Sequence, residues 1–90
     1  MLNITLDFRH IANVDDFYRQ LAEQARWRAG FGANLDALWD ALTGDLALPA
    51  RIRLKHWRQH PHPEQFTALV GVLREAEEEL DGALTIRIDH

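Results

Sequence analysis

The order in which two hydrophobic periodicities alternate along this sequence limits its fold more than any other feature. Three segments alternate apolar and polar residues, which predicts strands at 2–8, 51–57 and 84–88. Three others carry apolar residues at helical spacing, which predicts helices at 14–27, 35–43 and 64–80. Strands separated by helices favour parallel pairing. The expected fold is therefore α/β, a small three-stranded parallel sheet covered by helices in the order β-α-α-β-α-β.

Single residues mark where these elements begin and end. Asn13 and Asn34 stand before two of the helical segments, where a short polar side chain can cap the first turn. Gly44 and Gly82 follow the second and third helical segments and can adopt the left-handed conformation that ends a helix. We therefore expect the second helix to run over 35–43 and to end at Gly44.

The length and composition favour one soluble domain over residues 1–90. The chain contains no cysteine, so its core must form without disulfide bonds. The longest apolar run, residues 68–73, is far shorter than the ~20 residues that cross a bilayer. The first residues lack the basic and apolar segments of a signal peptide. We expect a cytoplasmic protein with no membrane partner.

Charged residues are unevenly distributed along the chain. The net charge is -4, because 14 acidic side chains outnumber 10 basic ones. This balance argues against a general polyanion binder, so no direct contact with nucleic acid is expected. A basic block at 51–63 nevertheless lies between acidic blocks at 31–50 and 64–90. The block pattern, rather than the net charge, is what a function has to explain.

The second helical segment places an acidic block on one face. Three leucines share one side of this helix: Leu35, Leu38 and Leu42. The opposite side holds Asp36, Asp40 and Thr43, and Trp39 lies at the boundary between the two. Packing does not require such a polar stripe. It is either a solvated surface, with Asp36 serving the helix N-terminus, or a binding site.

The last helical segment offers a second set of carboxylates. Glu75 and Glu79 are four residues apart and point away from the apolar stripe, with Glu78 beside them. Taken alone, this run is typical of a solvated helix face.

The run from Gly32 through Asn34-Leu35-Asp36-Ala37-Leu38-Trp39-Asp40 to Thr43-Gly44 closely resembles the characteristic segment of the barstar family. This family comprises small intracellular inhibitors of secreted bacterial ribonucleases. The resemblance extends to 73–76, which is similar to the family's last helix, and to 84–88, which is similar to its final strand. The family fold, a small parallel sheet with helices, agrees with the element order expected above.

The resemblance implies a basic ribonuclease as the partner, held by a monomer in a 1:1 complex without a cofactor. Asp40 falls where the family places the carboxylate that occupies the substrate's phosphate position. The other residues that the resemblance assigns to partner binding are Asp36, Trp39, Thr43, Asn34, Leu35, Phe31, Gly44, Glu75 and Glu79. A carboxylate on a rigid helix suits this role, because a ribonuclease holds its phosphodiester with Arg, Lys and His.

Several positions depart from the family pattern. Gly30 stands where the best-known family member carries a tyrosine that contacts the nuclease, and Asp45 replaces an aromatic residue. Arg26 and Arg28 bring basic groups near a surface expected to be acidic. The partner could therefore be a ribonuclease toxin of another type, with this chain as its immunity protein or antitoxin. A second hypothesis is an acidic interaction module for a partner that is not a nuclease.

The basic block suggests other functions only weakly. Its histidines, His56, His60 and His62, have no carboxylate among them, so no metal site is expected. The cations of this block are Arg51, Arg53, Lys55 and Arg58. They could contact RNA beside Trp57, or they could pair with the acidic helices. The chain has no serine, no cysteine and no glycine-rich phosphate loop, so enzymatic activity is not expected.

Overall fold

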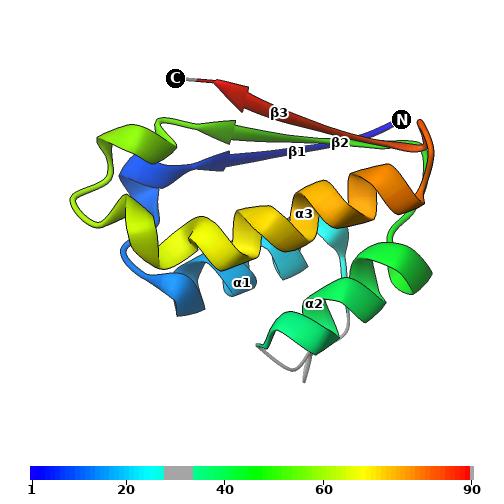
Figure 1. The fold of residues 1–90 in the computed structure, drawn as a ribbon, viewed down its shortest axis with the longest axis horizontal. Helices are drawn as coiled ribbons and strands as arrows, with labels where there is room; N and C mark the ends of the chain where they lie inside the picture. The colour runs from blue at the N-terminus through cyan, green and yellow to red at the C-terminus, as the bar shows by residue number, and fades with distance from the viewer. Residues whose placement is uncertain (28–33, 90) are drawn as a thin grey trace.

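A parallel sheet packed against three helices forms the described part of the protein, residues 1–27 and 34–89 of the computed structural model (Figure 1). The strands are β1 (Leu2–Asp7), β2 (Ala50–Lys55) and β3 (Leu84–Asp89). The helices are α1 (Val14–Ala25), α2 (Leu35–Asp40) and α3 (Thr67–Glu79). Strand β2 lies in the centre and pairs in parallel with β1 and β3. The predicted class and element order are confirmed.

The two faces of the sheet are in different environments, because alternate side chains of a strand point to opposite sides. One face is buried and consists of Ile4, Leu6, Ile52, Leu54, Leu84 and Ile86. All three helices lie on this side of the sheet (Figure 1). The opposite side, called here the open sheet face, consists of Asn3, Thr5, Asp7, Arg51, Arg53, Lys55, Thr85, Arg87 and Asp89. Parallel sheets usually have both faces covered.

Side chains from the helices cover the middle of both sheet edges. On the β1 edge, the Gln24 amide accepts a hydrogen bond from Thr5 N at 3.0 Å and donates one to Thr5 O at 2.8 Å. On the β3 edge, the Glu77 carboxylate accepts from Ile86 N at 2.7 Å, and Arg74 donates to Ile86 O at 3.3 Å. These bonds satisfy strand groups that would otherwise be open to pairing with another chain.

The end of the second helix differs from the prediction. Gly44 is not in the left-handed region, and the chain continues from α2 into a π-helical turn, Ala41–Asp45. Leu42 and Leu46 are both buried in the core on either side of Gly44. The chain stays wound through Asp45 because Leu46 as well as Leu42 must reach the core. The predicted termination at Gly44 is therefore wrong, whereas the predicted cap at Asn34 is confirmed by its bond to Ala37 N at 2.8 Å.

Three other boundaries move by a few residues. Helix α1 ends at Ala25, because Arg26 adopts the left-handed conformation with φ of 59°. Strand β2 ends at Lys55, since His56 is also left-handed and Trp57 begins a 3-10 turn. The predicted helix at 64–80 begins instead as a 3-10 turn, and α3 proper starts at Thr67. Gly82, with φ of 93°, forms the turn after α3 as expected.

Candidate functional site: an acidic surface on α2 and α3

The buried side of α2 holds the helix rigidly against the core. Leu38 and Leu42 are fully buried, as predicted, and Trp39 packs partly buried against the same core. Leu35, on the same side of the helix, is 42% exposed. It lies in the first turn of α2, and the contact of this helix with the core begins only at Leu38. Its exposure leaves an apolar side chain beside the polar stripe.

The polar side of α2 presents carboxylates to solvent. Asp36 and Asp40 are both exposed, as the helical spacing predicts. Thr43 is half-buried, and its hydroxyl donates to the Trp39 carbonyl at 2.8 Å. The Thr43 hydroxyl therefore uses its hydrogen within the helix, and toward a partner it can only accept hydrogen bonds. Gly44 is exposed beside it in the π-helical turn.

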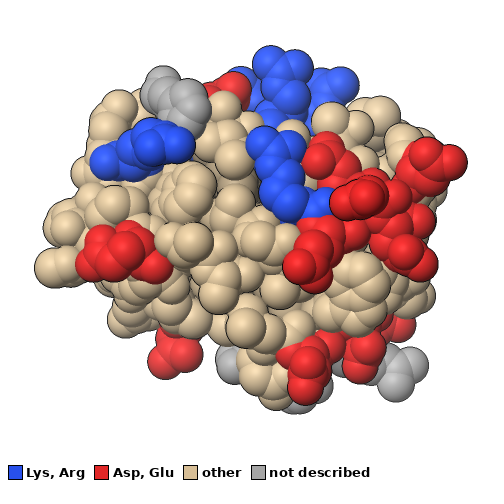
Figure 2. All heavy atoms as spheres, in the orientation of Figure 1, with Lys and Arg blue, Asp and Glu red and all other residues tan. Residues whose placement is uncertain are grey.

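Helix α3 packs against α2 and adds further carboxylates. Figure 2 shows acidic side chains gathered on the right of the molecule and along its lower edge, where Figure 1 places the end of α3 and α2. We call this region the acidic surface; its exposed members are Asp36, Asp40, Asp45, Glu75, Glu78 and Glu79. Within residues 1–27 and 34–89, none of these carboxylates forms an ion pair or a hydrogen bond through its side chain.

One glutamate of the acidic run has a different role. Glu77 is turned toward the sheet, where it accepts from Ile86 N and pairs with Arg74 at 3.1 Å. Its neighbours Glu78 and Glu79 are exposed. The run of acids in the sequence therefore contains both a structural carboxylate and free ones. The sequence spacing gave no sign of this division, because the partner of Glu77 lies on β3.

Asp45 belongs to the acidic surface, although the sequence marks it only as a departure from the family pattern. The structure places it exposed at the end of the π-helical turn that continues α2. Its presence in an acidic block directly after Gly44 was the available signal. Phe31, Gly30 and Arg28 lie outside the described residues.

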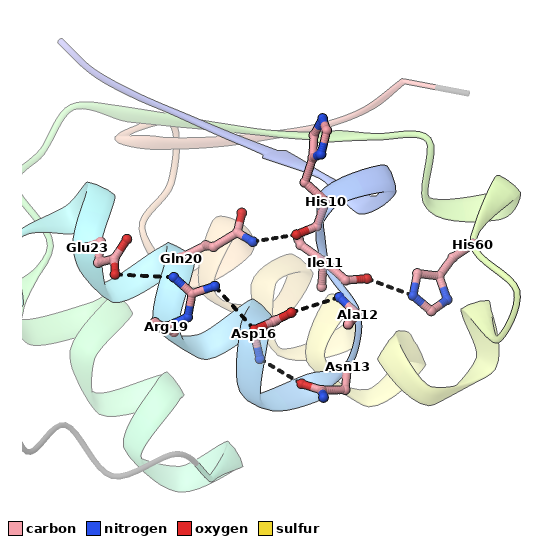
Figure 3. Close-up of polar contacts among 9 residues, drawn as sticks. All are labelled: His10, Ile11, Ala12, Asn13, Asp16, Arg19, Gln20, Glu23 and His60. Atoms are coloured by element: carbon pink, nitrogen blue, oxygen red, sulfur yellow. Dashed lines mark hydrogen bonds and ion pairs between the residues drawn. The ribbon is translucent and has the colours of Figure 1, made fainter.

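A second polar region surrounds the loop between β1 and α1 (Figure 3). Asp16 accepts from Ala12 N at 2.9 Å and pairs with Arg19 at 3.2 Å, and the first of these bonds chiefly lowers the Asp16 pKa. His60 is 8% exposed, and its Nε2 lies 2.8 Å from the Ile11 carbonyl. Its Nδ1 accepts from the backbone N–H of His62 at 2.9 Å. Both ring nitrogens of His60 are therefore engaged within the chain.

An open groove of about 600 Å³ lies over this loop. It is lined by residues that include His10, Asp16, His60 and His62. Asp16 and His60 are both engaged in hydrogen bonds within the chain (Figure 3). The part of the chain that the structure describes contains no group of three or more side chains suited to hold a metal ion. Two of the polar groups that line the groove, Asp16 and His60, are therefore not free to bind a ligand.

The described helices include none with the length and apolar character needed to cross a membrane. Trp27 and Trp57 are partly buried against the core. Trp57 donates through Nε1 to the Pro63 carbonyl at 2.9 Å, and the Arg58 guanidinium lies 5.9 Å from its ring centre. Trp57 is therefore held in place by its own loop.

The fold and the acidic surface together describe a small α/β protein that presents carboxylates from a rigid helix, an arrangement suited to a cationic partner. Residues 1–88 match the family model described as Barstar (barnase inhibitor). A protein of Bacillus subtilis (strain 168) named "Putative ribonuclease inhibitor YrdF" is 32% identical over 94 residues, which cover 99% of this chain and 100% of that protein. The chain belongs to the barstar family.

Proposed function

We propose that this protein inhibits a basic ribonuclease by occupying its active site with the acidic surface. The observation that carries the proposal is the set of exposed carboxylates on α2 and α3 that have no ion-pair partner among the described residues. Like charges held together weaken a fold slightly unless something pairs with them. A cationic active site would supply that pairing.

Asp40 is the central residue of this proposal. It lies on the exposed side of α2, one turn after Asp36, on a helix anchored by the buried Leu38. A ribonuclease binds its phosphodiester with Arg, Lys and His side chains, and a carboxylate can accept the same charge-assisted hydrogen bonds. Because α2 is already ordered, little conformational entropy is lost when the complex forms.

The neighbouring residues fit supporting roles. The Asn34 Oδ1 accepts a hydrogen bond from Ala37 N, which fixes the orientation of the Asn34 side-chain amide. The N–H groups of that amide remain available to a partner. Leu35, at 42% exposed, provides an apolar contact beside the carboxylates. Glu75 and Glu79 add negative charge from α3, which speeds the encounter with a basic enzyme.

This activity fits an immunity protein or antitoxin that protects the cytoplasm from a ribonuclease toxin. The chain would act as a monomer in a 1:1 complex. The departure at Asp45 lies at the end of the π-helical turn rather than in α2 itself, and Gly30 precedes α2 in the sequence. They favour a partner whose active-site rim differs from that of barnase.

The test is an inhibition titration against a panel of purified basic ribonucleases. The panel includes barnase and any small ribonuclease encoded beside this chain. We expect one enzyme to be fully inhibited at one equivalent of protein, and Asp40→Ala to need a large excess. Asp15→Ala is the matched control, because it removes one exposed acid from α1, away from the acidic surface.

Two outcomes would contradict the proposal. Inhibition that Asp40→Ala retains in full would exclude the acidic surface as the inhibitory site. Failure to inhibit any ribonuclease, together with Asp40-dependent binding of a purified protein that is not a nuclease, would favour the acidic interaction module instead.

A further inference from the structure

The open sheet face gathers the basic block that the proposed function leaves unexplained. It carries four cations, Arg51, Arg53, Lys55 and Arg87, and two acids, Asp7 and Asp89. We propose that this face binds the backbone of single-stranded RNA, and this proposal does not depend on ribonuclease inhibition. Figure 2 shows basic side chains at the top of the molecule, where Figure 1 places the sheet.

The strand register arranges these residues in three rows across the sheet. The first row is Asn3, Arg51 and Thr85, the second is Thr5, Arg53 and Arg87, and the third is Asp7, Lys55 and Asp89. Both acids therefore lie in one row at the carboxyl end of the strands. The first two rows contain only cations and neutral polar groups, so the positive potential is concentrated there.

Several of these groups are available to a ligand. Arg53 pairs with Asp89 at 2.7 Å, and Asp7 pairs with Arg9 at 2.7 Å. The side chains of Arg51, Lys55 and Arg87 form no hydrogen bond or ion pair with any residue in 1–27 or 34–89, although Arg87 and Lys55 interact electrostatically with Asp89. Long cations together with Asn and Thr side chains are the groups that proteins use to contact phosphates.

The net charge of -4 argues against polyanion binding by the surface as a whole, but the fold places the α2 carboxylates far from the sheet cations (Figure 1). The sheet and α2 lie at opposite ends of the dimension in which the Cα trace spans 27 Å (Figure 1). The Debye length is about 8 Å at physiological ionic strength. The field of the α2 carboxylates is therefore largely screened at the open sheet face.

The composition of the face favours RNA over other polyanionic partners. It presents no apolar or aromatic side chain, whereas the centre of a protein interface usually needs such anchors. The carboxylates of Asp7 and Asp89 repel phosphate but can accept hydrogen bonds from 2′-hydroxyl groups, which DNA lacks. Without aromatic side chains to stack on bases, binding should not depend on sequence and should weaken strongly with salt.

The test measures fluorescence anisotropy of a labelled oligouridylate about 12 nucleotides long with the full chain. Three free cations predict a slope of log affinity against log salt of roughly -2 between about 50 and 200 mM salt. The double variant Arg51→Glu/Arg87→Glu should lower affinity by at least about tenfold. Arg51→Lys/Arg87→Lys should retain binding, because it keeps the charge, and Asp40→Ala should change affinity less than about twofold.

Circular dichroism melting of each variant confirms that it remains folded. The proposal is overturned if the wild type does not bind at the lowest salt, or if the Glu variant binds as well as the wild type. It is also overturned if oligothymidylate binds equally well, or if anionic phosphatidylserine vesicles are bound in preference to RNA.

Discussion

The acidic surface and the open sheet face carry opposite charge, and they differ in how much of it is paired within the chain. On the sheet, Asp89 and Asp7 each hold an arginine at 2.7 Å. On α2 and the exposed side of α3, no described carboxylate has such a partner. The α2 carboxylates also lie on a helix anchored by buried leucines, whereas the sheet cations are on long, flexible side chains, of which only Arg53 has an ion-pair partner among the described residues. The two proposals differ accordingly: we expect a tight, specific partner for the first surface and a weak, salt-dependent one for the second.

The largest expected effect is on ribonuclease affinity. Asp40→Ala should lower it by at least about 3 kcal/mol, roughly 100-fold, because truncation leaves enzyme cations buried without a counter-charge. Arg87→Ala, on the other surface, should leave this affinity unchanged. Isothermal titration calorimetry measures both. Equal losses for the two variants would mean that the two surfaces are not functionally distinct.

The rigid base of the acidic surface can be tested with two identical substitutions on one helix. Leu38→Ala should destabilise the protein by about 2–5 kcal/mol, because it removes a fully buried side chain from the core. Leu35→Ala should change stability by less than about 0.5 kcal/mol, since Leu35 is 42% exposed. Urea unfolding followed by circular dichroism gives both values. A large stability loss for Leu35→Ala would contradict its placement at the surface.

The division within the glutamate run predicts a smaller difference in stability. Glu77→Ala should cost about 1–2 kcal/mol, because it removes the acceptor for Ile86 N and the partner of Arg74. Glu78→Ala should lie within about 0.5 kcal/mol of the wild type. Hydrogen exchange at the Ile86 amide should also accelerate in the Glu77 variant only. Unchanged protection of the Ile86 amide would show that the Glu77 carboxylate does not stabilise the β3 edge of the sheet.

The paired acids of the open sheet face predict a modest effect of acid on stability. Hydrogen bonding by Arg53 chiefly lowers the pKa of Asp89, and hydrogen bonding by Arg9 chiefly lowers that of Asp7. A lowered native pKa means that stability is fully present above the unfolded value near 3.9 and is lost as pH falls through the native value. Asp89→Asn should therefore flatten the decline of the melting temperature below about pH 4.

Arg53→Gln provides the control for this effect. It should produce the same flattening as Asp89→Asn, and the double variant should add nothing further, because the two residues form one pair. Additive changes would mean that Asp89 is stabilised by other groups.

Much of the fold follows from local sequence patterns. Period-two and helical segments predicted all three strands and all three helices, and Asn13 and Asn34 cap the helices as expected. The exposure of Asp36 and Asp40 followed from spacing alone. The boundary at Gly44 could not be predicted in this way, because a glycine permits a left-handed turn but does not require one. The burial of Leu46 decided the path of the chain.

By itself the sequence determined the order of elements, the caps and the acidic stripe of α2, because each depends on residues within a few positions of one another. The tertiary structure alone decided which carboxylates are free. Glu77 accepts a hydrogen bond from the backbone of Ile86 because packing places β3 beside it. Gln24 likewise bonds to the backbone of Thr5 because packing places β1 beside it. Only the packed structure shows that the β2 cations lie on the sheet face opposite the helices (Figure 1). Contacts between distant residues depend on packing, which no local pattern encodes.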